Sequence, residues 1–125
     1  DHHIPVVMLA DRLGLSKIYL EQVFSLLKRG KLVISIKGAQ GGYRLSRPAS
    51  EINVCQILSA LEQILFEPTE QSVADSAPAV EEVMATHVYT VLDQDIQKSL
   101  SKITLDQLVK ATNSIENRDN YMFFI

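Results

Sequence analysis

Residues 28–47, KRGKLVISIKGAQGGYRLSR, decide the fold of this chain. They contain six Lys or Arg and no acid, and their apolar residues form two short strand-like runs around a glycine-rich centre. The overlapping stretch before them, residues 11–30, reads as helix, tight turn, helix. A helix pair followed by a basic hairpin is the layout of a winged helix-turn-helix, which places one helix in a DNA groove and a charged loop on the flanking backbone.

Charge is unevenly distributed along the 125 residues. Residues 1–47 hold eight Lys or Arg against three acids, a balance of +5, whereas residues 48–125 hold four against twelve, a balance of −8. The two halves together give the formal net charge of −3. A basic half beside an acidic remainder indicates that one end of the chain binds a polyanion. The alternative is two ordinary solvated faces.

Composition excludes several classes of protein. A hydrophobic content of 46% argues against general disorder, and no apolar run approaches the ~20 residues of a membrane span. A single cysteine is typical of a reducing, cytoplasmic setting. Because the chain starts at Asp1, where a first helix is expected, we expect that helix of the domain to be missing from this sequence.

Apolar spacing and capping residues predict the elements of the first half. Ser16 is the expected N-cap of the second helix, in which Ile18 is expected to point inward, and Asn53 is the expected N-cap of the third. The expected helices span about residues 5–13, 17–29 and 54–65, and the expected strands span 32–36 and 43–45.

The second half reads as one long helix over about residues 80–102. Its apolar residues form two stripes, at positions 85, 89, 92, 96, 100 and 103 and at 84, 88 and 91. Because two stripes make a face too wide for one small domain, we interpret it as a dimerisation helix that also packs on its own body. The alternative is a third-layer helix in a monomer. Thr104 and Gln107 predict a capping box that opens a short last helix ending near Thr112.

These elements define the expected organisation, which is mainly α-helical. Residues 1–66 form the winged helix-turn-helix with its two-stranded wing, residues 67–79 form a loop, and residues 80–125 form the dimerisation helix, the short helix and a tail.

The second helix carries side chains suited to base reading. Lys17, Glu21 and Gln22 can share an exposed surface, since they are four and five residues apart. A Gln amide can pair with adenine, a Glu can accept from cytosine, and Ser16 at the helix N-terminus can hold a phosphate. The alternative is that Lys17 and Glu21 form a surface ion pair.

The glycine-rich loop predicts a tip that approaches a phosphate or enters the minor groove, with Lys37 and Gln40 presented there. Further cations are expected along the flanking backbone: Lys28, Arg29, Lys31, Arg44 and Arg47. The candidate DNA-binding residues are therefore Ser16, Lys17, Tyr19, Glu21, Gln22, Lys28, Lys37, Gln40, Tyr43 and Arg44.

Three motifs give this stretch a family resemblance: S-x-x-Y-L-E-Q from Ser16, G-x-x-G-G-Y-x-L from Gly38, and I-N-V-x-x-I-L-x-A-L-E from Ile52. The chain resembles the Rrf-two family of bacterial winged-helix regulators over about residues 5–66, and in pattern only over 80–112. The resemblance implies a homodimer whose two wings straddle a palindromic operator in double-stranded DNA. By position, Glu21 resembles the family's base-reading residue and Lys37 its minor-groove residue.

Many members of this family bind an iron–sulfur cluster through three cysteines in the loop before the long helix. This chain has no cysteine there, so we expect no cluster, no metal and no other cofactor. Cys55 is interpreted as a buried small hydrophobic residue, with a redox role as the alternative. No arrangement of a nucleophile with a base is evident, and His2, His3 and His87 do not make a metal site, so we expect no enzyme.

The C-terminal NYMFFI is similar to the ending of the cluster-free family members that repress cysteine metabolism. We therefore expect a homodimeric repressor of cysteine or sulfur metabolism. Alternatives are a redox- or stress-responsive regulator of another pathway and a protein-interaction module without DNA. The resemblance implies that Ile125 enters a carboxylate-binding pocket of cysteine synthase; docking of the aromatic tail into the dimer core is the alternative. The candidate partner-binding residues are Tyr121, Met122, Phe123, Phe124 and Ile125.

Overall fold

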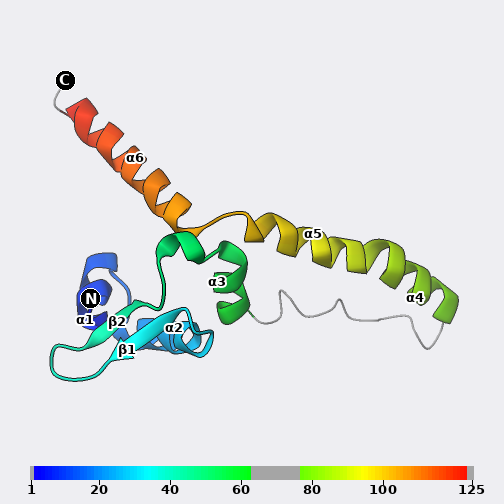
Figure 1. The fold of residues 1–125 in the computed structure, drawn as a ribbon, viewed down its shortest axis with the longest axis horizontal. Helices are drawn as coiled ribbons and strands as arrows, with labels where there is room; N and C mark the ends of the chain where they lie inside the picture. The colour runs from blue at the N-terminus through cyan, green and yellow to red at the C-terminus, as the bar shows by residue number, and fades with distance from the viewer. Residues whose placement is uncertain (1, 63–76, 124–125) are drawn as a thin grey trace.

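The structure is a computed structural model that describes residues 2–62 and 77–123. Most of this part is helical, and its two strands form one antiparallel sheet, which confirms the predicted winged-helix fold (Figure 1). The elements are α1 (Val6–Leu13), α2 (Lys17–Arg29), β1 (Val33–Ile36), β2 (Gly42–Leu45), η1 (Ala49–Glu51), α3 (Val54–Leu61), α4 (Pro78–Met84), η3 (Ala85–Tyr89), α5 (Thr90–Ser101) and α6 (Leu105–Phe123).

The helix pair forms where the sequence predicts it. Ser16 caps α2, since its hydroxyl accepts a hydrogen bond from the backbone N–H of Tyr19 at 3.2 Å. Leu20 of α2 is buried against α1, and α2 also contacts α3 and β1. The inward orientation expected for Ile18 is wrong: this side chain is 70% exposed. Residues two apart lie on nearly opposite sides of a helix, so the burial of Leu20 turns Ile18 to solvent.

The wing is tied to the N-terminal segment, which the sequence did not predict. β1 and β2 pair antiparallel, with Ser35 opposite Tyr43. On the other edge of β2, Ile4 and Tyr43 exchange two backbone hydrogen bonds of 2.9 and 3.0 Å. The segment before α1 therefore holds the hairpin in place.

Only part of the glycine-rich loop has the open surroundings expected of a tip that approaches DNA. Gly38, at φ 118°, faces open space, as a loop tip should. Gly42 instead lies against the chain itself: a Cβ there would come within 2.2 Å of the Ile4 carbonyl oxygen. Gly42 is thus required by the contact between the N-terminal segment and β2, rather than by an approach to DNA.

α3 begins as predicted and ends earlier. Asn53 and Gln56 form a reciprocal capping box, with hydrogen bonds of 3.0 and 2.9 Å between each backbone N–H and the other side chain. The helix ends at Leu61 instead of residue 65. Most of the loop expected over residues 67–79 lies outside the described residues, and α4 already begins at Pro78.

The long helix is continuous but contains a π-helical turn. α4, η3 and α5 follow one another from residue 78 to residue 101, and η3 interrupts the α-helical hydrogen bonding. Within this turn the Thr90 hydroxyl donates to the carbonyl oxygen of Ala85, five residues back, at 2.7 Å. α3 packs on α5. Along the predicted stripes, Tyr89, Ile96 and Leu100 are half-buried, whereas Val88, Val91 and Leu92 are exposed.

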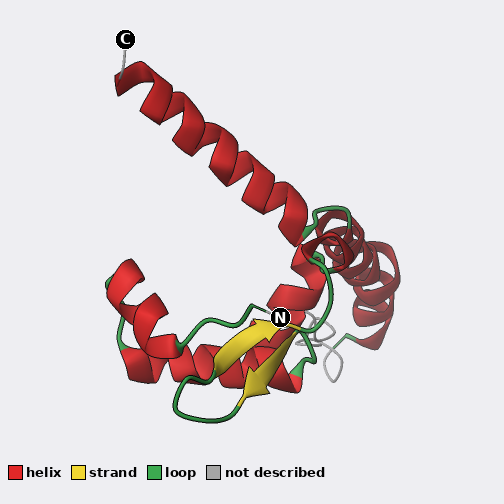
Figure 2. Ribbon diagram, turned by 60° about the vertical axis from the view of Figure 1, so that its left-hand side comes forward, coloured by secondary structure: helices red, strands yellow, loops and turns green. Residues whose placement is uncertain are grey.

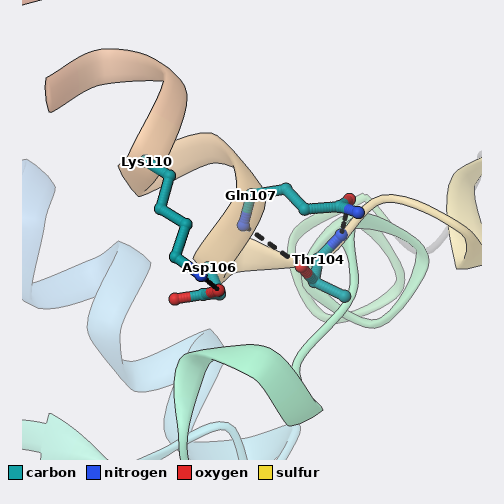
Figure 3. A network of polar contacts seen from close by, with 4 residues as sticks. All are labelled: Thr104, Asp106, Gln107 and Lys110. Atoms are coloured by element: carbon teal, nitrogen blue, oxygen red, sulfur yellow. Dashed lines mark hydrogen bonds and ion pairs between the residues drawn. The ribbon is translucent and has the colours of Figure 1, made fainter. Parts of the chain in front are cut away.

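The last helix starts at the predicted capping box and is much longer than expected. Thr104 and Gln107 exchange hydrogen bonds of 3.0 and 3.1 Å (Figure 3). The Asp106 carboxylate lies 2.9 Å from the Lys110 ammonium, and this hydrogen bond, with the charge of Asp106, raises the pKa of Lys110. The predicted end near Thr112 is wrong, because α6 continues to Phe123 and no Gly or Pro interrupts residues 105–123.

Both C-terminal helical segments extend away from the winged body. Figure 1 shows α6 and the α4–α5 segment projecting in different directions, and the turned view in Figure 2 shows α6 standing clear of the strands. No helix in the described ranges combines the length and the apolarity needed to cross a bilayer.

Candidate nucleic-acid interface

The exposed side of α2 brings several of the predicted base-reading residues together. Glu21 and Gln22 line a hollow of about 420 Å³ on this helix, together with Ile18, Ser25 and Leu26. The Lys17 ammonium lies 3.8 Å from the Glu21 carboxylate, and both side chains are about half exposed, so the alternative of a surface ion pair is present in the structure. Such an exposed pair contributes only ~0.3–0.5 kcal/mol, which leaves both groups available to a ligand.

Ile18 is the residue in this hollow that sequence reasoning missed as a surface group. The buried stripe of α2 centres on Leu20, with Val23, Phe24 and Leu27 beside it. Had that stripe been recognised from its own spacing of three and four residues, Ile18 would have fallen outside it.

The wing loop presents its predicted residues to solvent. Lys37 and Gln40 are exposed, and the loop projects from the body at the end of the molecule that also holds α1 (Figures 1 and 2). His3 contacts the backbone carbonyl of Gln40 through Nε2, which leaves the Gln40 side chain uncommitted to that contact.

The remaining cations fall into a second group. Lys28 and Arg29 are exposed at the C-terminal end of α2, and Lys31 is exposed in the turn that follows. A helix of 13 residues is about 20 Å long, so these cations lie far from Ser16 along the same element. The structure therefore places candidate phosphate contacts at both ends of α2 instead of in one cluster.

The side chains of three predicted DNA-contact residues are half-buried within the fold. The Tyr43 ring stacks on Phe24, with ring centres 4.8 Å apart, and packs against the core. Arg44 is half-buried on β2, opposite Ile34. Arg47, also half-buried, donates from Nε to the Glu51 carbonyl at 2.9 Å.

Arg47 makes a second bond, from Nη1 to the carbonyl of Lys31 at 3.4 Å. The same carbonyl accepts from the Ser46 hydroxyl at 2.7 Å, and Lys31 has a positive φ of 63°. Arg47 thus fastens the base of the hairpin, and the prediction that it faces the DNA backbone finds no support in these contacts.

Cys55 is half-buried, not buried as expected, and borders a hollow of about 310 Å³ together with Arg47 and Gly30. It is the only cysteine of the chain. In the described part of the chain, no three His, Cys, Asp or Glu side chains lie close enough together to hold a metal. Iron–sulfur clusters are held mainly by several thiolates, so the donors present do not fit such a cluster.

The candidate partner-binding tail is described only in part. The backbone of Tyr121, Met122 and Phe123 forms the end of α6, whereas Phe124 and Ile125 lie outside the described residues.

Comparisons with known proteins agree with this architecture. Residues 1–111 match the family model Rrf2, described as an iron-dependent transcriptional regulator. The regulator IscR of Pectobacterium atrosepticum is 34% identical over 106 residues, which are 85% of this chain and 64% of that protein. The chain thus spans less than two thirds of the length of this relative.

Two solved structures are similar as well. IscR of T. potens is 33% identical, with a TM-score of 0.60 over 88% of this chain and 71% of that one. CymR of B. subtilis, titled the global cysteine regulator, is 28% identical, with a TM-score of 0.64 over 87% and 79%. These relatives are transcriptional regulators and not enzymes, in agreement with the prediction for this chain. Since the family model matches residues 1–111 of this chain and the structure has the winged fold, the chain belongs to the Rrf2 family of transcriptional regulators.

Proposed function

We propose that this chain is a DNA-binding transcriptional repressor in which the exposed side of α2 reads bases and the wing loop holds the adjacent backbone. The observation that carries the proposal is the projecting hairpin with exposed Lys37, next to a recognition helix whose Glu21 and Gln22 are free of the core. A helix fits the major groove, and a loop with little side-chain bulk fits the narrower minor groove.

The homodimer on a palindromic operator that we propose is supported by apolar side chains left uncovered along the long helix. Val88 and Val91 of the second predicted stripe and Leu92 of the first are exposed along the long helix, while α5 contacts α3. A second copy that covers these three side chains gives the dimerisation helix expected from the sequence.

The pathway we propose is cysteine or sulfur metabolism, controlled without an iron–sulfur cluster. The similarity to CymR supports the pathway, and the single cysteine of the chain supports the absence of a cluster. The description of the matching family model as an iron-dependent regulator favours the second candidate, a regulator of another pathway that responds to redox or stress signals. Promoters recovered from cells with the bound protein distinguish the two candidates.

The experiment for DNA recognition selects sequences from a random duplex pool with the wild-type protein. We expect an inverted repeat to be enriched, because a two-fold symmetric dimer contacts two equivalent half-sites. Glu21→Gln is expected to change one base pair in each half-site, since a correct base contact discriminates by about 1–3 kcal/mol.

Glu116→Gln removes the same charge from the exposed surface of α6 and is the matched control. This variant is expected to enrich the same DNA sequence as the wild-type protein. If the wild type enriches no sequence, or if Glu21→Gln enriches the same one, α2 is not the reading element.

We further propose that the tail binds cysteine synthase through Ile125, a proposal that rests on the resemblance of NYMFFI to the tails of cysteine repressors. A peptide end offers a carboxylate and a side chain to a pocket on a partner. Deleting Ile125 from the intact protein is expected to abolish co-purification with the enzyme and to leave the dimer unchanged. Undiminished co-purification would discard this role.

A further inference from the structure

An apolar side chain stands exposed in the middle of the polar reading surface of α2. Ile18 is 70% exposed, more than any other large apolar residue in the described part of the chain. Its neighbours in sequence are Lys17 and Tyr19, both also exposed. The Ile side chain forms no hydrogen bond, so what it can offer a ligand at this position is an apolar contact.

The helix puts Ile18 on the same side as the proposed base-reading residues. Glu21 and Gln22 follow it by three and four residues, and all three border one hollow of about 420 Å³. At a rise of 1.5 Å per residue, Ile18 precedes Gln22 by about 6 Å along the axis of α2. Bases on one strand are about 3.4 Å apart, so this offset corresponds to roughly two base steps.

DNA offers one group in the major groove that suits an aliphatic side chain. The C5-methyl group of thymine projects there and is recognised by apolar contact, whereas the other bases present hydrogen-bonding groups. The phosphate backbone offers no comparable apolar partner. Beside Ile18, the Glu21 carboxylate and the Gln22 amide offer hydrogen-bonding groups for the base edges that flank a thymine methyl group.

We propose that Ile18 is a specificity-determining residue that reads the C5-methyl group of a thymine, one to two base steps from the base contacted by Glu21 or Gln22. The inference rests on the proposed function, because it deepens the role of the same helix. It predicts a required thymine in each half-site.

The test removes the methyl group and the side chain in turn. The probe is the duplex enriched from the random pool by the wild-type protein, with each thymine replaced singly by deoxyuridine, which lacks only the methyl group. Binding is measured by fluorescence anisotropy for the wild type, for Ile18→Ala and for Val109→Ala, a control that shortens an exposed apolar residue on α6. Analytical ultracentrifugation records the oligomeric state of each protein.

We expect the wild type to lose about fourfold in affinity at one thymine per half-site, the effect of one buried methyl group. Val109→Ala is expected to show the same ratio of affinities for the thymine and deoxyuridine duplexes as the wild type. Ile18→Ala is expected to bind both duplexes equally and to keep the wild-type dependence on salt, because an apolar contact releases no counterions.

The inference is overturned if deoxyuridine has no effect on the wild type at any position, or if Ile18→Ala keeps the full methyl effect. It is also overturned if Ile18→Ala changes the oligomeric state, since Ile18 would then belong to a contact between protein chains. A wild type that enriches no sequence refutes the proposed function itself, a result distinct from enrichment without a methyl effect.

Discussion

Replacing Arg47 by alanine is expected to destabilise the protein without changing the salt dependence of its DNA binding, and replacing Lys37 by alanine is expected to do the reverse. Both residues are cations of the hairpin region, and the sequence predicts a contact with DNA for each of them. The structure distinguishes them, because Arg47 donates to two backbone carbonyls, whereas Lys37 is exposed on the projecting loop.

The cost of losing Arg47 follows from its two hydrogen bonds. Bonds to a charged group contribute about 1.5–3 kcal/mol each, but the bond to the Lys31 carbonyl, at 3.4 Å, is long and weak. The bond to the Glu51 carbonyl, at 2.9 Å, therefore dominates, and the expected loss is about 2 kcal/mol. In a chain of this length that loss lowers Tm by roughly 8 °C.

The cost of losing Lys37 depends on salt instead. Each phosphate contact contributes about 0.9 to the slope of log affinity against log salt, so the proposed dimer, with one Lys37 on each of two wings, loses about 1.8. A fourfold rise in salt then weakens the wild type about 12-fold more than it weakens Lys37→Ala. The Tm of this variant is expected to stay close to that of the wild type, because exposed side chains contribute little to stability.

Thermal unfolding at fixed protein concentration and anisotropy titrations over a salt series measure the two effects on the same samples. Arg47→Lys keeps the charge and loses the planar two-bond geometry, so it is expected to remain destabilised. The reasoning is refuted if Arg47→Ala flattens the salt slope at unchanged Tm, or if Lys37→Ala lowers Tm and leaves the slope alone.

Three further variants test the local structure. Gly42→Ala is expected to displace Ile4 and to cost about 2 kcal/mol for two backbone hydrogen bonds, which thermal unfolding and faster amide exchange on β2 would record; unchanged exchange would contradict the contact. Thr104→Ala removes one half of a capping box and is expected to cost about 1 kcal/mol, so an unaltered Tm would argue against the box. Asp106→Asn is expected to bring the raised pKa of Lys110 back toward its ordinary value, as followed by NMR titration of Nζ. A lysine whose pKa is higher in the folded than in the unfolded protein stabilises the fold below the unfolded pKa, and this contribution is lost as the pH rises through the folded pKa. Any difference in stability between the two proteins should therefore disappear in strongly alkaline solution.

The helix starts were predictable because their causes are local in sequence. Ser16, Asn53 and Thr104 each cap a helix through bonds to residues three positions later. The short apolar runs at residues 32–36 and 43–45 around the glycine-rich loop likewise predicted the wing. Of the candidate site, the exposure of Glu21 and Gln22 could be predicted from their helical spacing from Lys17, and that of Lys37 from its place beside the glycine-rich loop.

The features that the sequence does not predict depend on contacts distant in the chain or lack a local signal. The polar residues after Thr112 show no apolar face from which a helix could be predicted, yet no Gly or Pro among them ends one. The bond from Arg47 to the Glu51 carbonyl and the stacking of Tyr43 on Phe24 depend on the fold, and the DNA contacts predicted for Arg47 and Tyr43 from charge and position stay predictions. The inward orientation predicted for Ile18 is wrong because the buried stripe of α2 centres on Leu20, two residues further on.

The π-helical turn at Ala85–Tyr89 makes one short region of the long helix tolerant of a change in chain length. A π-turn accommodates one residue more than the α-helix around it. Deleting a residue there lets the turn relax to α-helix with both flanking segments keeping their azimuth, whereas the same deletion inside α5 would swing everything beyond it by about 100°. Insertions and deletions among homologues of this chain should therefore collect at this turn, where they leave the apolar stripes on either side facing the same way.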